Sequence, residues 1–224
     1  MSMTWFVTGT DTGVGKTAVS CGLLVAAARA GLRTAAIKPV AAGCDDAHQN
    51  DDALLLQASM TEPLAYHQIN PVALRAAIAP HIAAHLEGKR MQANQLAGWC
   101  RGIMSGRSDL VLIEGAGGWR VPINARETLA DVAQQLRVGV VLVVGMRLGC
   151  INHALLTAEA IRRDGLELLG WVANQPGSRM DRHQDNLDTL RELLSAPLLG
   201  DIPFLPHWQG EDIAGHLDIK ALLQ

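Results

Sequence analysis

The chain has 224 residues, of which 49% are hydrophobic and 18% charged, and its formal net charge is −3. This length suits one large α/β domain, and a chain without a basic block is not expected to bind nucleic acid. The four cysteines form no C-x-x-C pair, which argues against a zinc site. No signal-peptide pattern or bilayer-length apolar run occurs, so we expect a cytoplasmic protein without a membrane partner.

Six short apolar runs are typical of strands that are buried on both faces of a sheet. They cover residues 4–9, 33–40, 109–115, 139–146, 168–175 and 198–205. Helical patterns separate them, at residues 16–31, 94–106, 128–137, 151–165 and 186–195. This alternation predicts a single α/β domain over residues 1–224 with a doubly wound, mostly parallel sheet. The stretch 41–80 is the part of the chain where we most expect irregular structure, and long loops of this kind are often functional.

Residues 6–17, FVTGTDTGVGKT, have the features of a phosphate-binding loop between a strand and a helix. The general pattern G-x-x-x-x-G-K-[ST] would have its first glycine at position 10, but this chain has it one residue earlier, at Gly9. Backbone N–H groups would surround the phosphates, with Lys16 at the β- and γ-phosphates and the Thr17 hydroxyl on Mg²⁺. A glycine-rich turn that binds nothing is the alternative. We therefore predict a P-loop NTPase fold in which ATP contacts Thr12, Gly13, Val14, Gly15, Lys16, Thr17 and Ala18.

The apolar run at 109–115 brings Glu114 to the carboxyl end of a strand, where ligands of such sheets bind. A carboxylate at this place can bind Mg²⁺ through its oxygens, and Gly115, Ala116 and Gly117 leave room for phosphates. The alternative is a surface glutamate before a turn. A phosphate loop in the same sheet favours the metal-binding interpretation.

Two further stretches carry charged side chains that could reach the same cleft. Lys38 follows an apolar strand, and Pro39 fixes a turn that would direct the amine towards the phosphates, where a second lysine stabilises a transferring phosphoryl group. An edge lysine that snorkels to solvent is the alternative. In NDDALLLQ, residues 50–57, Asp51 or Asp52 either caps a helix or supplies a second Mg²⁺ ligand, and the local pattern leaves both interpretations open.

These stretches resemble the dethiobiotin synthetase family of biotin biosynthesis, over essentially the full length and in the same order. The phosphate loop matches the family pattern G-T-D-T-x-V-G-K-T, in which the glycine stands early. The family pattern N-x-D-A-L-x-L-Q selects Asp52 over Asp51. Further matches are IKPVAAG at 37–43, EGAGGW at 114–119, the stretch 143–158 that contains LGCINHALLTA, GWVAN at 170–174 and APLLGDIP at 196–203.

The resemblance implies an enzyme that uses ATP to carboxylate 7,8-diaminopelargonate with CO₂ and to close the ring of dethiobiotin. The implied route passes through a carbamate and a carbamic–phosphoric anhydride, and it releases ADP and phosphate. Lys16 and Lys38 are the implied catalytic residues, and Mg²⁺ is implied as a cofactor held by Thr17, Asp52 and Glu114. The implied adenine site consists of Asn174, Gln175, Pro203, Phe204 and Leu205.

The resemblance also implies a homodimer, with the diamine bound near the interface between the two copies. Backbone N–H groups at a helix N-terminus, around Gly149, Cys150 and Asn152, would bind the substrate carboxylate of the same chain or of the partner. Cys150 is then a packing residue and not a nucleophile. The complete set of implied substrate-binding residues is Thr12, Lys38, Ala42, Gly149, Cys150 and Asn152.

Two positions depart from the family pattern: Ala42 stands where members carry a serine beside the substrate, and Gly13 where an acidic residue is known. The stretch after Leu205 matches poorly, so adenine contacts beyond it are open. A ParA/MinD-like ATPase is the competing class, but the signature lysine of its loop would fall at Asp11. A synthase of the cobyrinate diamide type would need a glutaminase domain, for which the chain is too short. A catalytically silent relative is a further alternative.

Overall fold

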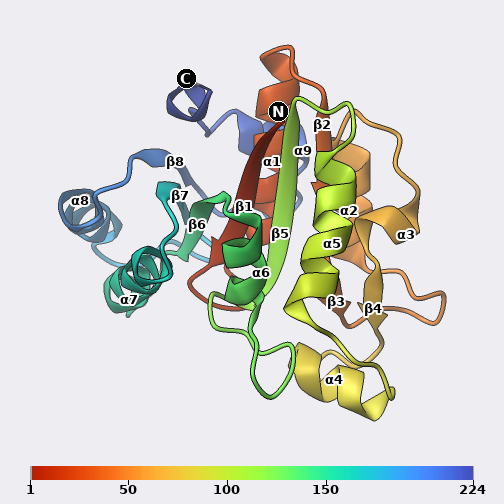
Figure 1. The fold of residues 1–224 in the computed structure, drawn as a ribbon. Helices are drawn as coiled ribbons and strands as arrows, with labels where there is room; N and C mark the ends of the chain where they lie inside the picture. The colour runs from red at the N-terminus through yellow and green to blue at the C-terminus, as the bar shows by residue number, and fades with distance from the viewer. Residues whose placement is uncertain (1, 224) are drawn as a thin grey trace.

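Six parallel strands form the central sheet of the structure, a computed structural model that describes residues 2–223. In spatial order they are β2 (Thr34–Ile37), β5 (Leu110–Gly118), β1 (Met3–Gly9), β6 (Gly139–Gly145), β7 (Leu168–Asn174) and β8 (Leu198–Ile202), and every neighbouring pair is parallel. The chain extends from β1 to both edges of the sheet, which is the doubly wound arrangement (Figure 1). The predicted fold class is confirmed, and each of the six predicted runs overlaps one strand of this sheet.

Helices cover both faces of this sheet (Figure 1). On one face lie α5 (Ala93–Met104), α6 (Leu129–Leu136), α7 (Cys150–Arg163) and α8 (His183–Leu193), and on the other lie α1 (Lys16–Arg29), α2 (Asp51–Ser59) and α9 (Gly210–Ala214). Alternate residues of β5 enter the two cores, because Val111 and Ile113 pack on the first group while Leu110 and Leu112 pack on the second. None of the helices in residues 2–223 has the length and apolar character that a membrane crossing requires.

Residues 41–80, where irregular structure is most expected, also contain short regular elements. This stretch and its edges contain β3 (Val40–Ala42) and β4 (Val72–Leu74), which form a separate parallel pair, with α2 and α3 (Tyr66–Ile69) between them. Strands of three residues are too short to show a readable alternation, and each depends on a partner that is distant in sequence. The helical elements α4 (Pro80–Leu86), α9 and η1 (Lys220–Leu222) are also absent from the predicted set, because they are too short to show a helical period.

The register of β2 and β5 brings two predicted site residues together. Ile37, the last residue of β2, pairs with Ile113 of β5. Lys38, which follows β2, therefore lies beside Glu114 of β5, and the two side chains are in contact. The predicted strand 33–40 is divided here, because Pro39 has no N–H group to donate to a ladder. The chain resumes as β3 one residue later.

Candidate active site

The phosphate loop is anchored to the sheet by the side chain of Val14, which is fully buried. A Cβ atom on Gly9 would lie 2.6 Å from Val14 Cγ2, and one on Gly145 would lie 2.7 Å from Val14 Cγ1. Both positions therefore need glycine, because any side chain would collide with the valine where it enters between β1 and β6. The early glycine of the loop follows from this packing.

The carboxyl end of β7 holds the other side of the loop. Asn174 is buried, and its Nδ2 donates a hydrogen bond to the Val14 carbonyl oxygen at 2.8 Å. Gly15 has a φ of +87°, and a Cβ atom there would lie 2.2 Å from Asn174 Nδ2. Helix α1 begins at the next residue, so the loop leads into a helix N-terminus as predicted.

We expect Gly15→Ala to disrupt the loop and Gly13→Ala to be better tolerated, although their φ values are +87° and +72°. Alanine in this region costs about 1–2 kcal/mol of unfolding free energy in either case. At Gly15 the new methyl group would also displace Asn174 and its hydrogen bond, which adds about 1 kcal/mol, whereas Gly13 has open space around it. Thermal unfolding and ATP titration of both variants test this. Equal losses of thermal stability and of ATP affinity in the two variants would show that Asn174 does not hold the loop.

Three charged side chains and one hydroxyl meet beside the phosphate loop. Lys38 Nζ lies 2.6 Å from Asp52 Oδ2 and 2.6 Å from Glu114 Oε1. The Thr17 hydroxyl donates to the same Glu114 oxygen at 2.9 Å. Glu114 is fully buried and Lys38 nearly so, which excludes a surface glutamate and a lysine that snorkels to solvent. Of the two candidate aspartates, Asp52 reaches this cluster, and Asp51 is exposed.

Burial and charge act in opposite directions on these groups. Burial alone would lower the pKa of Lys38, but Glu114 and Asp52 outweigh it, and the pKa is raised. Burial would raise the pKa of Asp52, but the Lys38 charge outweighs it, and this pKa is lowered. Burial lowers the pKa of Lys16 to about 8, in spite of its attraction to Glu114. The site therefore holds one firmly charged lysine and one whose charge depends on what binds beside it.

We expect ATP binding to take up a proton at about pH 9 and not at about pH 7. The free Lys16 amine, with a pKa of about 8, is mostly neutral at the higher pH and mostly charged at the lower one. The triphosphate favours the charged form, so the pKa rises in the complex and a proton is drawn from solvent. Calorimetry in buffers of different ionisation enthalpy measures this uptake. Equal heats of binding in all buffers at the higher pH would show that Lys16 does not contact the phosphates.

A cavity of about 770 Å³ opens over the cluster. Of the predicted site residues, those that line it are Thr12, Gly13, Gly15, Lys16, Thr17, Ala18, Lys38, Ala42, Asp52, Ala116 and Gly117. Residues that the sequence motifs did not indicate complete the wall: Ala77, Ile78, Ala79, Pro80, Arg120, Val121, Pro122 and Trp208. Their segments follow the ends of β4, β5 and β8, and this position after a strand is the one signal that could have found them.

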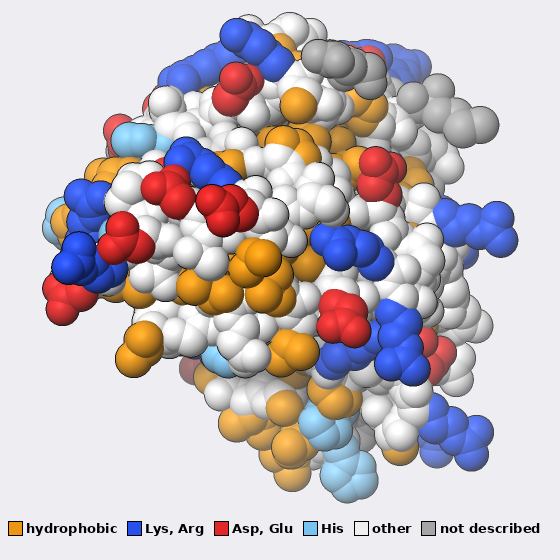
Figure 2. Space-filling model, turned by 90° about the vertical axis from the view of Figure 1, so that its left-hand side faces the viewer, with side chains coloured by type: hydrophobic (Ala, Val, Ile, Leu, Met, Phe, Trp, Pro, Cys, Tyr) orange, Lys and Arg blue, Asp and Glu red, His pale blue; other side chains and the backbone are white. Residues whose placement is uncertain are grey.

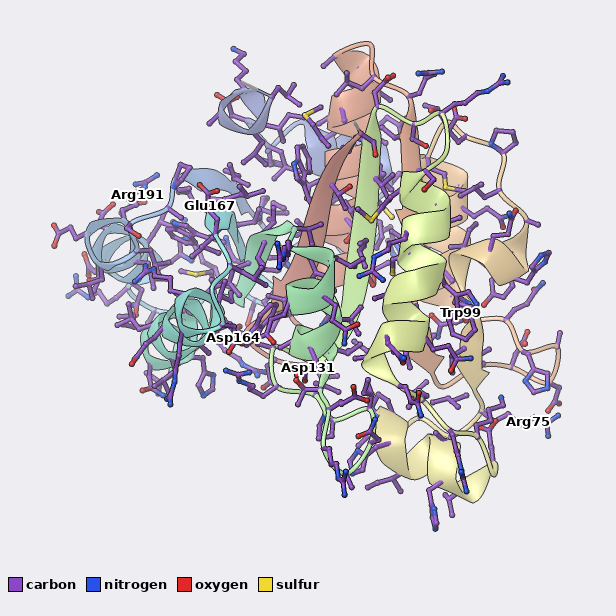
Figure 3. All side chains as sticks on the ribbon, viewed as in Figure 1. Arg75, Trp99, Asp131, Asp164, Glu167 and Arg191 are labelled. Atoms are coloured by element: carbon purple, nitrogen blue, oxygen red, sulfur yellow. The ribbon has the colours of Figure 1, made fainter. Side chains whose placement is uncertain are left out.

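The loop after β5 is fixed by Asp164, at the end of α7 (Figure 3). Trp119 Nε1 donates a hydrogen bond to Asp164 Oδ2 at 2.7 Å, and the Arg120 guanidinium forms an ion pair with the same carboxylate at 2.8 Å. The Trp119 ring also packs edge-on against Phe6 of β1, with ring centroids 5.9 Å apart. These contacts hold the segment that supplies one wall of the cavity.

The predicted residues Gly149, Cys150 and Asn152 do not line the cavity of their own chain. They stand at the start of α7, where Gly149 has a φ of +94° and Cys150 is buried. An ion pair between Arg147 and Asp11 links their loop to the phosphate loop. The structure therefore brings this group to the edge of the site, but not into it.

The predicted adenine residues lie at the ends of β7 and β8, also outside the lining of the cavity. The Gln175 backbone N–H donates to the Ile202 carbonyl oxygen at 3.0 Å, which joins the two segments. Phe204 is 48% exposed. Asn174 connects this region to the phosphate loop through its hydrogen bond to Val14.

The site combines a glycine-rich loop that leads from β1 into α1, a lysine and a threonine at the helix start, and the buried carboxylate of Glu114 on β5. This combination defines a P-loop NTPase. The septum site-determining protein MinD of Pyrococcus horikoshii, complexed with Mg-ADP, has a similar structure. Its TM-score is 0.57 with 18% identity, over 99% of this chain and 89% of that chain, which shows a shared fold alone.

Similarity in sequence is much closer to another group of proteins. The ATP-dependent dethiobiotin synthetase of Cellvibrio japonicus is 55% identical over 98% of this chain and 97% of its own length. The ATP-dependent dethiobiotin synthetase of Marinobacter nauticus is 56% identical over 99% of this chain and 98% of its own length. A family model described as an AAA domain matches residues 3–212. The chain belongs to the ATP-dependent dethiobiotin synthetase family, as its motifs predicted, and shares only the fold with the ParA/MinD class.

Proposed function

We propose that the chain catalyses the ATP-dependent carboxylation and ring closure of 7,8-diaminopelargonate with CO₂, which yields dethiobiotin, ADP and phosphate. The observation that carries this proposal is the presence of two lysines in one cavity, Lys16 at the phosphate loop and Lys38 in the carboxylate cluster. Relatives at 55% and 56% identity bear the name of this activity. The proposal includes one domain over residues 1–224 that works in the cytoplasm, where ATP is supplied.

The reaction makes two C–N bonds and transfers one phosphoryl group. One amine adds to CO₂ and loses a proton, which gives a carbamate. A carbamate oxygen displaces ADP from the γ-phosphorus, and the second amine attacks the carbonyl carbon of the anhydride, loses a proton and releases phosphate. Negative charge lies on the carbamate and on the transferred phosphoryl group, and the ammonium groups of Lys16 and Lys38 would stabilise it at both places.

We propose further that Mg²⁺ binds at Thr17, Asp52 and Glu114. The buried Glu114 Oε2 atom has no hydrogen-bond partner among the described residues, and the Lys38 ammonium between the carboxylates is consistent with a cation-binding cluster. No group of three or more His, Cys, Asp or Glu side chains in residues 2–223 could hold a metal ion by itself. Nucleotide sites bind Mg²⁺ with one or two carboxylates and with phosphate oxygens. When bound, the ion neutralises charge on those oxygens.

The apolar part of the cavity wall suits the aliphatic chain of the diamine. Ala42, Ile78, Pro80 and Val121 contribute to it. Ala42 offers no hydroxyl to the substrate, and Gly13 offers no carboxylate near the phosphates. Both departures from the family pattern leave the two lysines and the proposed metal ligands unchanged.

For the base of ATP, we propose contacts with Asn174, Gln175 and the segment 203–205. Asn174 donates one N–H to the Val14 carbonyl, so its second N–H and its Oδ1 remain for the edge of the base. This placement also explains why the end of β7 is joined to the phosphate loop, because one side chain would then contact both the loop and the base.

The proposed assembly is a dimer in which each copy completes the substrate site of the other. Gly149, Cys150 and Asn152 do not line their own cavity, and beside them Leu148 is 94% exposed and Leu156 is also exposed. Figure 2 views the side that carries α7 and α8 and shows hydrophobic side chains gathered in patches between charged ones. Sedimentation analysis measures the assembly. A fully active monomer at micromolar concentration would contradict it.

The proposed activity is tested by incubating the purified chain with the diamine, labelled bicarbonate and MgATP. We expect labelled dethiobiotin and ADP in equal amounts, with neither formed when the diamine is omitted. ATP consumption without dethiobiotin would rule out the proposed reaction.

A further inference from the structure

We propose that Trp208 binds the nucleotide, with its indole ring stacked on the adenine base. This inference rests on the proposed use of ATP. It concerns the segment after Leu205, where the chain departs from the family pattern.

Trp208 belongs to the same cavity wall as the start of α1. It lines the cavity together with Lys16, Thr17 and Ala18, the residues that lead from the phosphate loop into the helix. Among the lining residues in the described part of the chain, Trp208 is the one aromatic side chain. A ligand held by the phosphate loop therefore meets one aromatic ring in the wall of this cavity, while Phe204 of the proposed base site lies outside the lining.

The packing of α9 on α1 keeps Trp208 at this place. A Cβ atom on Gly22 of α1 would lie 2.4 Å from Ile213 Cγ2, so the two helices are in direct contact. At the start of α9, the Gln209 backbone N–H donates to Asp212 Oδ2 at 2.8 Å. Trp208 precedes this anchored start by two residues, which restricts where its ring can lie. The ring also packs against the apolar core on that face of the sheet.

The chain on the other side of Trp208 leads to the proposed base site. Trp208 follows the segment 203–205 by three residues, and that segment is joined to Gln175 through Ile202. A base between these elements would meet polar groups at its edge and the indole at its face. Stacking on an aromatic ring tolerates every base, because each base has a π face. Trp208 would therefore strengthen the binding of any nucleoside triphosphate without selecting adenine.

A role in packing alone is separated from a role in binding by comparing two substitutions and two ligands. Trp208→Leu fills apolar space without a π system, and Trp208→Phe keeps an aromatic face. We expect Trp208→Leu to raise the Kd for ATP and for CTP about tenfold or more, and Trp208→Phe to restore most of the affinity. Inorganic tripolyphosphate, which has no base, should bind equally well to both variants and to the unaltered chain. The matched control is Trp99→Leu, a partly exposed tryptophan on α5, across the sheet from α1 (Figure 3).

An unchanged Kd for ATP in Trp208→Leu would overturn the inference, and so would an equal loss of tripolyphosphate binding, since the loop itself would then be damaged. If the unaltered chain binds tripolyphosphate but no ATP, the proposed function fails as well. A second measurement does not depend on the leucine variant folding. ADP should change the tryptophan fluorescence of the unaltered chain and of Trp99→Phe, but not of Trp208→Phe. Retention of the full signal in Trp208→Phe would also overturn the inference.

Discussion

Replacement of Lys38 by methionine is expected to lower kcat for dethiobiotin formation about a hundredfold to a thousandfold while ATP still binds. The Lys38 ammonium is buried and lies 2.6 Å from both Asp52 and Glu114, so no other described cation takes this place in the cluster. Methionine keeps the length and apolar character of the stem but removes the charge that would stabilise the carbamate and the phosphoryl group. Nucleotide binding depends mainly on the phosphate loop and should remain within a few-fold.

The same substitution leaves Glu114 buried without its cation. Removal of one partner of a buried ion pair costs about 3–5 kcal/mol of unfolding free energy, so kcat should be measured well below the lowered melting temperature. Lys89→Met is the matched control, because Lys89 is exposed and its ion pair with Glu87 is not part of the cluster. Near-normal turnover in the Lys38 variant would remove this lysine from the mechanism.

Replacement of Glu114 by glutamine is expected to raise the Mg²⁺ concentration for half-maximal turnover about tenfold or more. The glutamine has nearly the same shape but lacks the negative charge, and the Glu114 carboxylate is fully buried with one oxygen free of hydrogen bonds among the described residues. Because a buried charge is lost, the attraction that raises the pKa of Lys38 is also weakened.

Asp51→Asn provides the control for this variant, since Asp51 is exposed beside Asp52 and does not contact the cluster. Metal binding is followed without turnover by titrating Mg²⁺ into each variant in the presence of ADP. An unchanged Mg²⁺ dependence in the Glu114 variant would exclude this carboxylate as a ligand.

The central sheet could be predicted because its strands are buried on both faces and are apolar throughout. Lys38 and Glu114 could be predicted for a related reason, since they are charged side chains directly after apolar runs. Asp52 could not be chosen over Asp51 from local pattern, because both suit a helix start; only the family pattern selected it.

The parts that could not be predicted depend on contacts between distant segments. Trp208 and Arg120 reach the cavity because α9 packs on α1 and because Asp164 holds the loop after β5. Neither residue belongs to a period or a motif, although Arg120 directly follows the stretch EGAGGW. The pairing of β3 with β4 could not be predicted for the same reason, since each strand gains its hydrogen bonds from a partner about thirty residues away.

The buried Val14 side chain has a consequence for the thermodynamics of nucleotide binding. Since Gly9, Gly145 and Asn174 fix this residue in the free protein, the backbone of the loop is ordered when the chain folds. The entropy of ordering is then lost during folding and does not oppose association. We therefore regard the loop as a preorganised anion receptor, in which the early glycine that first distinguished the sequence sets the rigidity of the binding site.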